Sequence, residues 1–321
     1  MIKCSICDSI HNHKVFKVKE MMFGYRDEFL YFQCEKCKCL QIFAIPPNIS
    51  KYYPTKYYSL SPYSCYNSDS IIKKHAKNKW YNYAVFNKSI IGKIIYKKYP
   101  SANLRSLSMV PINKNLKILD IGCGTGTMLY ALKSIGFKNL LGIDPNIEKS
   151  IRYKNGLNII KNDIYNLSGE WDIIMFHHSF EHMPKPKDVL SKSFKILKND
   201  GLCIIRIPTV SSYAWEYYGV DWVELDAPRH YYLHSVASMK ILAAKTHFEI
   251  KKIVYDSNDF QFWGSEQYKR GIPLYSNSSY NGNPSISIFT KKDIAKFKKK
   301  AAILNSINYG DRAIYYLYKS R

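Results

Sequence analysis

The feature that most constrains the fold of this 321-residue chain is a glycine-rich turn between an apolar segment and a helical one. Residues 118–129 read ILDIGCGTGTML, so Gly122, Gly124 and Gly126 occupy alternate positions. Glycine lacks a Cβ, which permits left-handed turns and lets the backbone approach a ligand closely. The helix predicted at 127–135 presents unpaired N–H groups at its start. We therefore expect a strand–loop–helix unit that binds a nucleotide-like ligand, although dehydrogenases and plain tight turns also use glycine triplets.

Further apolar segments of strand length follow this unit along the chain. They are predicted at 139–144, 157–161, 171–176, 201–207 and 249–255, with a last covering helix at 238–247. The alternation of strands and helices predicts an α/β fold with a parallel sheet covered on both faces. In such sheets the ligand lies at the carboxyl ends of the strands.

Acidic residues stand at two of these strand ends. Asp144 closes the segment 139–144, where a carboxylate can accept hydrogen bonds from both hydroxyls of a ribose. Asp163 follows the segment 157–161, and an acid there can accept a hydrogen bond from the exocyclic amine of an adenine.

Taken in order, these motifs resemble those of class I S-adenosylmethionine-dependent methyltransferases. The motifs are Asp120-Ile-Gly-Cys-Gly-Thr-Gly126, Asp144, Asp163-Ile164 and Phe180-Glu-His-Met-Pro184. A dehydrogenase would more often carry Gly-x-Gly-x-x-Gly. The resemblance implies a Rossmann-like seven-stranded sheet and S-adenosylmethionine as cofactor. It puts the three glycines around the methionine part, Asp144 on the ribose, and Asp163 and Ile164 at the adenine. Asp120 is expected to order the glycine loop or to meet the amino group of the cofactor.

A second site is predicted near the N-terminus, where two Cys-x-x-Cys pairs occur. Cys4 and Cys7 form the first pair, and Cys34 and Cys37 form the second, at an interval that suits a hairpin. This spacing is typical of zinc ribbons, and four thiolates would make the metal structural because they leave no open position. Substitute ligands are Cys39 and, more weakly, His11 and His13. The alternatives are four unrelated buried thiols, or disulfides, which we disfavour because no secretory signal precedes the pairs.

The chain is strongly basic, with 48 Lys and Arg against 25 Asp and Glu and a formal charge of +23. Such a charge is compatible with nucleic-acid binding. Solvated helix faces explain it as well, because lysines recur at helical spacing at 73–79 and 296–300. We therefore regard nucleic acid as a possible but not favoured partner. No apolar run is long enough to cross a bilayer, and lysines interrupt the nearest one at 90–96. With no signal segment at the start, we expect a cytoplasmic protein.

Five parts are predicted along the chain. They are a zinc ribbon at 1–48, a helical connector or lid at 49–114, a methyltransferase core at 115–256, an insertion that shapes the acceptor site at 257–309, and a last core strand at 310–321. In similar enzymes the connector lies over the cofactor, and an antiparallel last strand slots between the fifth and sixth. Tyr52, Tyr53, Tyr57 and Tyr58 could line a pocket in the connector. Within the insertion we expect a polar loop at 276–284 and a lysine-rich helix at 291–307, which Gly310 would cap.

Methyl transfer to a hydroxyl requires a base, and four histidines are candidates. His177 and His178 end the segment 171–176, and His182 follows Glu181. His230 lies in Asp-Ala-Pro-Arg-His, which resembles a stretch of zinc-ribbon methyltransferases of nucleotide-linked deoxysugars, where a histidine acts as base. Those enzymes carry a glutamate before it, whereas this chain has Arg229, which could instead bind a phosphate or carboxylate of the acceptor. The alternative for His230 is a cap or a hydrogen bond to the backbone.

The overall layout resembles methyltransferases of bacterial surface-polysaccharide pathways. We therefore expect methylation of a small polar acceptor, a hydroxyl of a sugar, nucleotide sugar or glycan precursor, with His230 or His177 as base. An RNA or protein methyltransferase is the alternative, and it would use the basic surface and the zinc ribbon for docking. A noncatalytic cofactor-binding protein is less expected, because the glycine loop and the acidic series are intact.

Overall fold

The computed structural model describes residues 2–54 and 70–320, so Tyr57 and Tyr58 of the predicted connector lie outside the described residues. By internal contacts the chain divides into two compact units. The first, which we call the ribbon unit, contains residues 2–54, 180–190 and 206–320. The second, the nucleotide unit, contains residues 70–179 and 191–205. Strand β9 (Leu197–Pro208) contributes residues to both units.

The nucleotide unit is built on a largely parallel sheet, with strand order β9-β8-β4-β5-β7-β6. Its other strands are β4 (Lys117–Ile121), β5 (Asn139–Ile143), β6 (Ile151–Arg152), β7 (Asn158–Ile160) and β8 (Trp171–His177). β4 pairs in parallel with β5 and with β8, and β5 pairs in parallel with β7. Each of the four strands predicted between residues 139 and 207 is confirmed. Strands of such a sheet are buried on both faces, so their apolar runs are visible in the sequence.

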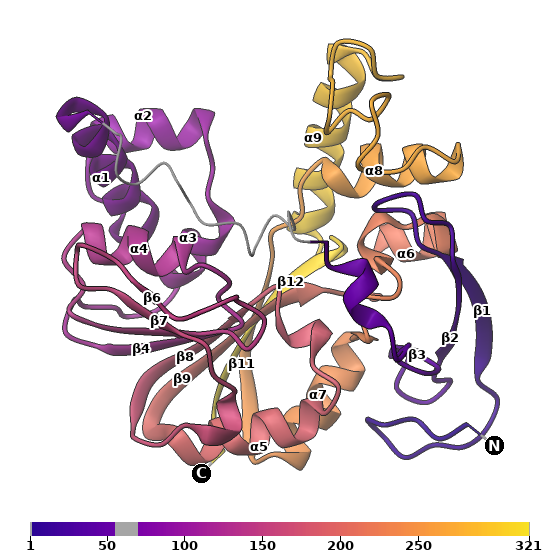
Figure 1. Cartoon of the computed structure of the whole chain (residues 1–321), viewed down its shortest axis with the longest axis horizontal. Helices are drawn as coiled ribbons and strands as arrows, with labels where there is room; N and C mark the ends of the chain where they lie inside the picture. Colours follow the sequence, from indigo (N-terminus) through magenta and orange to yellow (C-terminus); the bar gives the residue numbers. More distant parts are fainter. Residues whose placement is uncertain (1, 55–69, 321) are drawn as a thin grey trace. The chain divides into compact units, whose positions relative to one another are not determined.

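The helices of this unit are α1 (Ile71–Phe86), α2 (Ile90–Lys98), α3 (Ala102–Leu107), α4 (Thr127–Ser134) and most of α5 (Pro186–Ile196). Of these, α4 begins at Thr127, where the sequence predicts it, and α1 to α3 lie in the predicted helical connector. The Ser70 side chain accepts a hydrogen bond from Lys73 N–H and so caps α1. At the other end of α1 the Phe86 ring stacks on Phe137, with centroids 5.8 Å apart. Figure 1 shows α1 and α2 side by side, and they contact each other.

The expected alternation of strand and helix is wrong at two successive connections. Between β5 and β7 the chain forms the two-residue strand β6, which pairs antiparallel with β7, and between β7 and β8 it forms only a short 3-10 helix, Ile164–Asn166. The segment between β5 and β7 reads DPNIEKSIRYKNG. It contains a proline, a glycine and few apolar residues, so it offers no apolar helical face to bury on the sheet.

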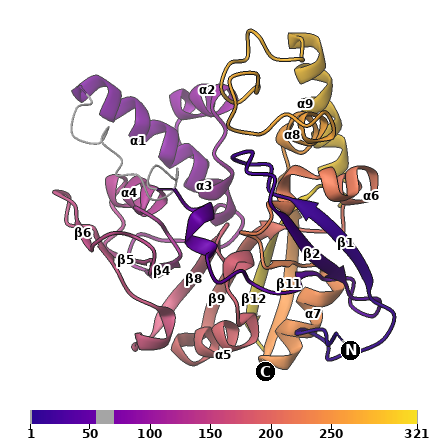
Figure 2. The ribbon, with the colours of Figure 1, turned by 45° about the vertical axis from the view of Figure 1, so that its right-hand side comes forward.

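In the ribbon unit the N-terminal segment forms antiparallel strands β1 (Lys14–Lys19), β2 (Glu28–Gln33) and β3 (Leu40–Ile42), followed by a 3-10 helix, Ile49–Tyr52. The paired β1 and β2 can be followed in Figure 2. β3 also pairs with β10 (Tyr232–Leu233), which directly follows the Pro-Arg-His segment. The sequence alone does not predict this pairing, because nothing in a two-residue strand specifies its partner.

The C-terminal part of the ribbon unit contains two antiparallel strands, β11 (Phe248–Tyr255) and β12 (Arg312–Lys319). β12 lies between β11 and β9, as the resemblance to methyltransferases implies, and the sheet is mixed. The helices here are α6 (Tyr213–Tyr218), α7 (Val236–Lys245), α8 (Phe260–Lys269) and α9 (Lys291–Ser306), with short 3-10 turns at Phe180–His182, Gly219–Asp221 and Val223–Leu225. The sequence predicts neither α6 nor α8.

Gly310 is not the cap of α9. The helix ends at Ser306, and Asn308 adopts the left-handed backbone conformation, with φ 58°. Tyr309 N–H then donates to the Leu304 carbonyl at 2.8 Å. Glycine at position 310 is explained by a close approach instead, since a Cβ there would come within 2.5 Å of the Ser257 hydroxyl oxygen.

None of the helices in the described ranges combines the length and the apolar character that a bilayer crossing requires.

Candidate active site and metal centre

The parallel register of the nucleotide unit brings the predicted cofactor residues to one edge of its sheet. Asp120, near the end of β4, is in register with Gly142 on β5 and Met175 on β8. The loops after β4, β5, β7 and β8 therefore leave from the same edge. The glycine loop follows β4, Asp144 follows β5 and Asp163 follows β7. His177 is the last residue of β8.

The glycine loop adopts a conformation that other residues would disfavour. Gly122, Gly124 and Gly126 all have positive φ, at 70°, 56° and 78°. A Cβ at Gly122 would also lie 2.4 Å from the Ser179 Cβ, and one at Gly126 would lie 2.3 Å from the Ile159 Cδ1. The loop begins with hydrogen bonds from Gly122 N–H and Cys123 N–H to the Ile143 carbonyl. The turn therefore favours glycine at all three positions, and packing also requires it at Gly122 and Gly126.

Asp144 is tied to this loop. Its Oδ2 accepts a 2.8 Å hydrogen bond from Gly124 N–H, and its Oδ1 accepts one of 2.8 Å from Asn146 N–H. The side chain is largely buried. Its carboxylate thus holds the loop in the shape described above, in addition to any contact with a ribose.

Asp120 lies beneath the loop, 3% exposed. Burial, reinforced by the charge of Asp144, raises the pKa of Asp120 to about 8. Its Oδ1 accepts no hydrogen bond from the residues that the structure describes. Buried carboxyl oxygens are nearly always hydrogen-bonded, so a bound group with a hydrogen-bond donor is the expected partner.

Asp163 and Ile164 follow β7. The Asp163 carboxylate caps the 3-10 helix Ile164–Asn166 by accepting a 3.1 Å hydrogen bond from Tyr165 N–H. The Ile164 side chain is 3% exposed. His177 is half-buried, and two residues later the Ser179 hydroxyl donates to the Ile121 carbonyl at 2.7 Å.

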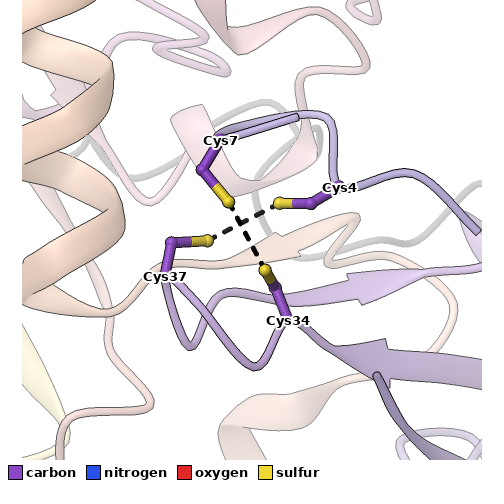
Figure 3. A group of neighbouring side chains, drawn as sticks. All are labelled: Cys4, Cys7, Cys34 and Cys37. Carbon is purple, nitrogen blue, oxygen red and sulfur yellow. Dashed lines mark hydrogen bonds between the residues drawn. The ribbon is translucent and has the colours of Figure 1, made fainter. Parts of the chain in front are cut away.

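The four cysteines of the predicted zinc site lie together in the ribbon unit. Figure 3 shows their sulfur atoms pointing toward a common centre. The Cys4 and Cys37 sulfurs are 3.5 Å apart and those of Cys7 and Cys34 are 3.4 Å apart, too far for a disulfide. All four ligand atoms lie within 4.8 Å of one another, as tetrahedral coordination by thiolates requires. The donor set and its geometry therefore fit a zinc ion.

Cys39 is not part of this group. Its buried sulfur lies 3.9 Å from His234 Nδ1. His13 Nε2 hydrogen-bonds the Ser9 carbonyl at 3.1 Å. Among the described residues the four-thiol group contains neither of these substitutes, nor His11.

Arg229 is fully buried, and its guanidinium is occupied by groups of the protein. Nε and Nη2 donate to the Asp226 carboxylate, Nη2 also donates to Glu20 at 2.9 Å, and Nη1 donates to the Tyr52 carbonyl at 3.2 Å. The planar group also lies over the Phe23 ring at 5.3 Å. The predicted contact with an acceptor phosphate or carboxylate does not fit this arrangement, because the guanidinium already joins the ribbon to the 226–230 segment.

His230 is 6% exposed and held by its neighbours in one orientation. Its Nδ1 is 2.7 Å from the Glu224 carbonyl, which only accepts hydrogen bonds, so Nδ1 carries the proton and Nε2 has the lone pair. Nε2 lies 3.8 Å from Asp226 Oδ2 and 4.0 Å from Glu181 Oε1. Burial lowers the pKa of His230, while Asp226 opposes the shift. The ring is therefore a neutral imidazole with a basic nitrogen between two carboxyl groups.

His182 and Glu181 complete this cluster. The His182 ring lies 4.7 Å from the His230 ring, and its Nδ1 is 2.8 Å from the Arg229 carbonyl. Burial lowers the pKa of His182 to about 3 and raises that of Glu181 to about 8. Ligand atoms of Glu181, His182 and His230 lie within 4.8 Å of one another, so this group could also hold a cation. The sequence alone does not predict that Glu181 lies near His230. The position of Glu181 directly before His182 is the one sequence signal that pointed to it.

The loop that carries these residues is fastened to the start of β12. Arg312 Nε donates to Glu224 at 2.6 Å, and Trp222 Nε1 donates to Asp311 at 3.0 Å. Asp311 and Arg312 thus hold the loop whose Glu224 carbonyl orients His230.

Comparisons with known proteins agree with the order of motifs and strands. Residues 95–253 match a family model described as a methyltransferase domain. The matched residues, 95–253, form a methyltransferase domain.

The curated relatives of the methyltransferase domain are named as enzymes of ubiquinone or menaquinone biosynthesis. A ubiquinone biosynthesis O-methyltransferase of Psychrobacter arcticus is 25% identical over 173 residues, which cover 46% of this chain and 65% of that protein. A ubiquinone/menaquinone biosynthesis C-methyltransferase UbiE of Campylobacter jejuni is 30% identical over 108 residues, 29% of this chain and 45% of that protein. The chain thus spans less than two thirds of the length of these relatives.

Solved structures are similar at lower identity. A methyltransferase from Archaeoglobus fulgidus has a TM-score of 0.42 and 20% identity, with 71% of this chain and 99% of that chain covered. The cyclopropane synthase MmaA2 from Mycobacterium tuberculosis has a TM-score of 0.41 and 16% identity, with 64% and 78% covered.

The residues of the methyltransferase domain suit its cofactor. S-Adenosylmethionine carries an ammonium group, which could pair with the buried Asp120 Oδ1. The positive-φ glycines give its backbone a close approach to the loop.

Proposed function

We propose that this methyltransferase transfers a methyl group to a hydroxyl of a small polar acceptor, a sugar, nucleotide sugar or surface-glycan precursor. The observation that carries the proposal is the fixed, neutral imidazole of His230. A hydroxyl must lose its proton to become a good nucleophile, and Nε2 of this ring is a base held between carboxyl groups. Among the curated relatives, the O-methyltransferase of Psychrobacter arcticus supports oxygen as the acceptor atom.

The cofactor would be held by the nucleotide unit. Gly122, Gly124 and Gly126 would surround its methionine part, Asp120 would pair with its amino group, and Asp144 would accept hydrogen bonds from its ribose hydroxyls. Asp163 and Ile164 would meet the adenine. When bound, the cofactor supplies a methyl group carried on a positively charged sulfur.

The ribbon unit would supply the base. His230 Nε2 would accept the proton of the acceptor hydroxyl. During this step the Nδ1–H group would keep its hydrogen bond to the Glu224 carbonyl. The imidazolium that results lies 3.8 Å from Asp226 Oδ2, so the Asp226 carboxylate can stabilise it. Glu181 Oε1 lies 4.0 Å from Nε2, and Glu181 would take the place of the glutamate that similar enzymes carry at the position of Arg229. His177 is the second candidate base.

The four-cysteine cluster would bind a structural zinc ion. A ribbon of this size buries too little apolar surface to fold by itself, and metal binding would contribute the missing free energy. Arg229, Ser235 and β10 join the ribbon to the segment of His230, so a folded ribbon would keep the base in position.

The test is a transfer assay with labelled S-adenosylmethionine and two acceptor pools, nucleotide sugars with glycan fragments in one and total RNA in the other. We expect label in the sugar pool only, and as an alkali-stable methyl ether. Label confined to the RNA pool would contradict the proposal, and it would make the basic surface the substrate-binding part.

A further inference from the structure

Helices α1 and α2 carry a surface that is both apolar and cationic. Five isoleucines on them are largely exposed: Ile71 76%, Ile72 81%, Ile90 82%, Ile91 59% and Ile94 66%. Lysines 73, 74, 93, 97 and 98 are exposed on the same two helices. We call these ten residues the α1–α2 surface. Isolated exposed apolar residues are ordinary, but a group of large ones on neighbouring helices marks an interaction site.

Packing of the two helices explains why the isoleucines point away from the protein. Gly92 is buried against α1, where a Cβ would come 2.1 Å from the Lys79 carbonyl oxygen. The α2 backbone is therefore pressed against α1 on that side. Ile90, Ile91 and Ile94 follow the i, i+1, i+4 spacing of a single helix face, and they stay exposed on another side of α2.

Within the described residues, the helices of this region carry no acid that would neutralise its charge. Residues 70–119 contain eleven Lys and Arg and no Asp or Glu. α1 packs against α2, α3 and α4, and these three helices contain no acidic residue either. The surface therefore has a strong positive potential next to exposed hydrocarbon.

We propose that the α1–α2 surface docks on an anionic phospholipid bilayer. Such a bilayer offers negative headgroups to the lysines and an acyl boundary to the isoleucines, as interfacial amphipathic helices require. Trp80 and Tyr99 line a cavity between the helices with Ile95 and Lys77, and these aromatic types are common at membrane interfaces. A second copy of the chain would bring two surfaces of the same charge together. RNA would use the lysines but leave the isoleucines in water.

The experiment measures sedimentation of the full-length protein with vesicles. We expect binding to vesicles of phosphatidylcholine with phosphatidylglycerol, little binding to phosphatidylcholine alone, and weakening as salt increases. Each lysine near an anionic surface contributes about 1 kcal/mol, a factor of about five, so Lys97→Glu/Lys98→Glu should lower the partition coefficient by at least about thirtyfold. Ile90→Ala/Ile94→Ala keeps the charge and should lower it by about tenfold.

The matched control is Lys298→Glu/Lys299→Glu on α9, which makes the same change of charge on another exposed lysine-rich helix. This control should reduce binding much less than the α2 variant. Equal losses for both variants would mean attraction by net charge and would overturn the proposal. Full binding by the isoleucine variant, or no binding to anionic vesicles, would overturn it too. Retention of RNA that depends on Lys97 and Lys98 but not on Ile90 and Ile94 would assign the surface to nucleic acid instead. All substituted side chains are exposed, so circular dichroism should report unchanged folding.

Discussion

The phenol oxygen of Tyr31, on strand β2 of the ribbon, donates a 2.8 Å hydrogen bond to the carbonyl oxygen of His230. Tyr31 is fully buried, and its ring lies in the hairpin that also carries Cys34 and Cys37. The Ser235 hydroxyl donates to the Cys37 carbonyl only a few residues further along the chain. The candidate base and the candidate metal centre are therefore parts of one packed structure.

Tyr31→Phe should reduce methyl transfer without weakening cofactor binding. The substitution keeps the ring but leaves the His230 carbonyl without its donor, which costs about 1–3 kcal/mol when the group is buried. We expect a lower melting temperature and a lower kcat, with an unchanged Kd for S-adenosylhomocysteine. Tyr25→Phe is the control, because that tyrosine is on the ribbon and 43% exposed. Equal kcat values for Tyr31→Phe and Tyr25→Phe would contradict the claim that the ribbon holds His230 in position.

Protein purified under reducing conditions should contain one zinc ion per chain. Cys34→Ser/Cys37→Ser should lose the metal and unfold the ribbon, because structural zinc sites supply folding free energy. Cys39→Ser and Cys203→Ser should keep it, since both thiols are buried outside the cluster. Elemental analysis measures the ratio. Absence of stoichiometric zinc from the unmodified protein, or its loss on Cys39→Ser, would contradict the assignment.

Asp144→Ala should weaken binding of S-adenosylhomocysteine by at least about a hundredfold. The carboxylate accepts a hydrogen bond from Gly124 N–H and is expected to accept others from the ribose, and hydrogen bonds to a charged group contribute about 1.5–3 kcal/mol each. Titration calorimetry measures the change. Asp200→Ala, at an exposed position on β9, should bind normally. An Asp144→Ala variant that binds as the wild type does would remove this residue from the cofactor site.

Cofactor binding should depend on pH through Asp120. Its pKa is raised from the ordinary value to about 8, so in the ligand-free protein the carboxyl group is protonated below pH 8. A cationic amino group requires the carboxylate, so affinity should increase as pH rises from 6 toward 8, by up to about tenfold per unit. Asp120→Asn removes the titration and should flatten this dependence. If the affinity of Asp120→Asn depended on pH as steeply as that of the wild type, the pH dependence would come from another group.

Arg229 should affect stability rather than acceptor affinity. Removing one partner of a buried ion pair costs about 3–5 kcal/mol. Arg229→Ala should therefore unfold at much lower denaturant concentration, because it leaves Glu20 and Asp226 buried without their cation. Arg229→Lys keeps the charge but not the planar fork, and we expect it to recover part of the stability with a KM close to that of the wild type. A stable Arg229→Lys protein whose KM is greatly increased would restore the predicted contact with the acceptor.

The nucleotide unit could be predicted well from sequence because its signals are local. Apolar runs mark β4, β5, β7 and β8, and the glycines mark the loop after β4. Contacts between distant segments could not be predicted. Neither Glu181 beside His230, nor Glu20 on Arg229, nor β10 beside β3 has a signal in spacing or periodicity. The sequence cannot show whether an arginine is buried or exposed. The prediction that Arg229 binds the acceptor therefore overlooked its contacts with Glu20 and Asp226.

The central claim is that His230 removes a proton from an acceptor hydroxyl. The most direct test compares turnover of the wild type and His230→Ala on the sugar-pool acceptor at saturating S-adenosylmethionine. General-base catalysis contributes about 10²–10⁴-fold, so we expect kcat to fall by that factor while the Kd for S-adenosylhomocysteine is unchanged. A His230→Ala enzyme with the wild-type kcat would contradict the account and make His177 the next candidate base to test.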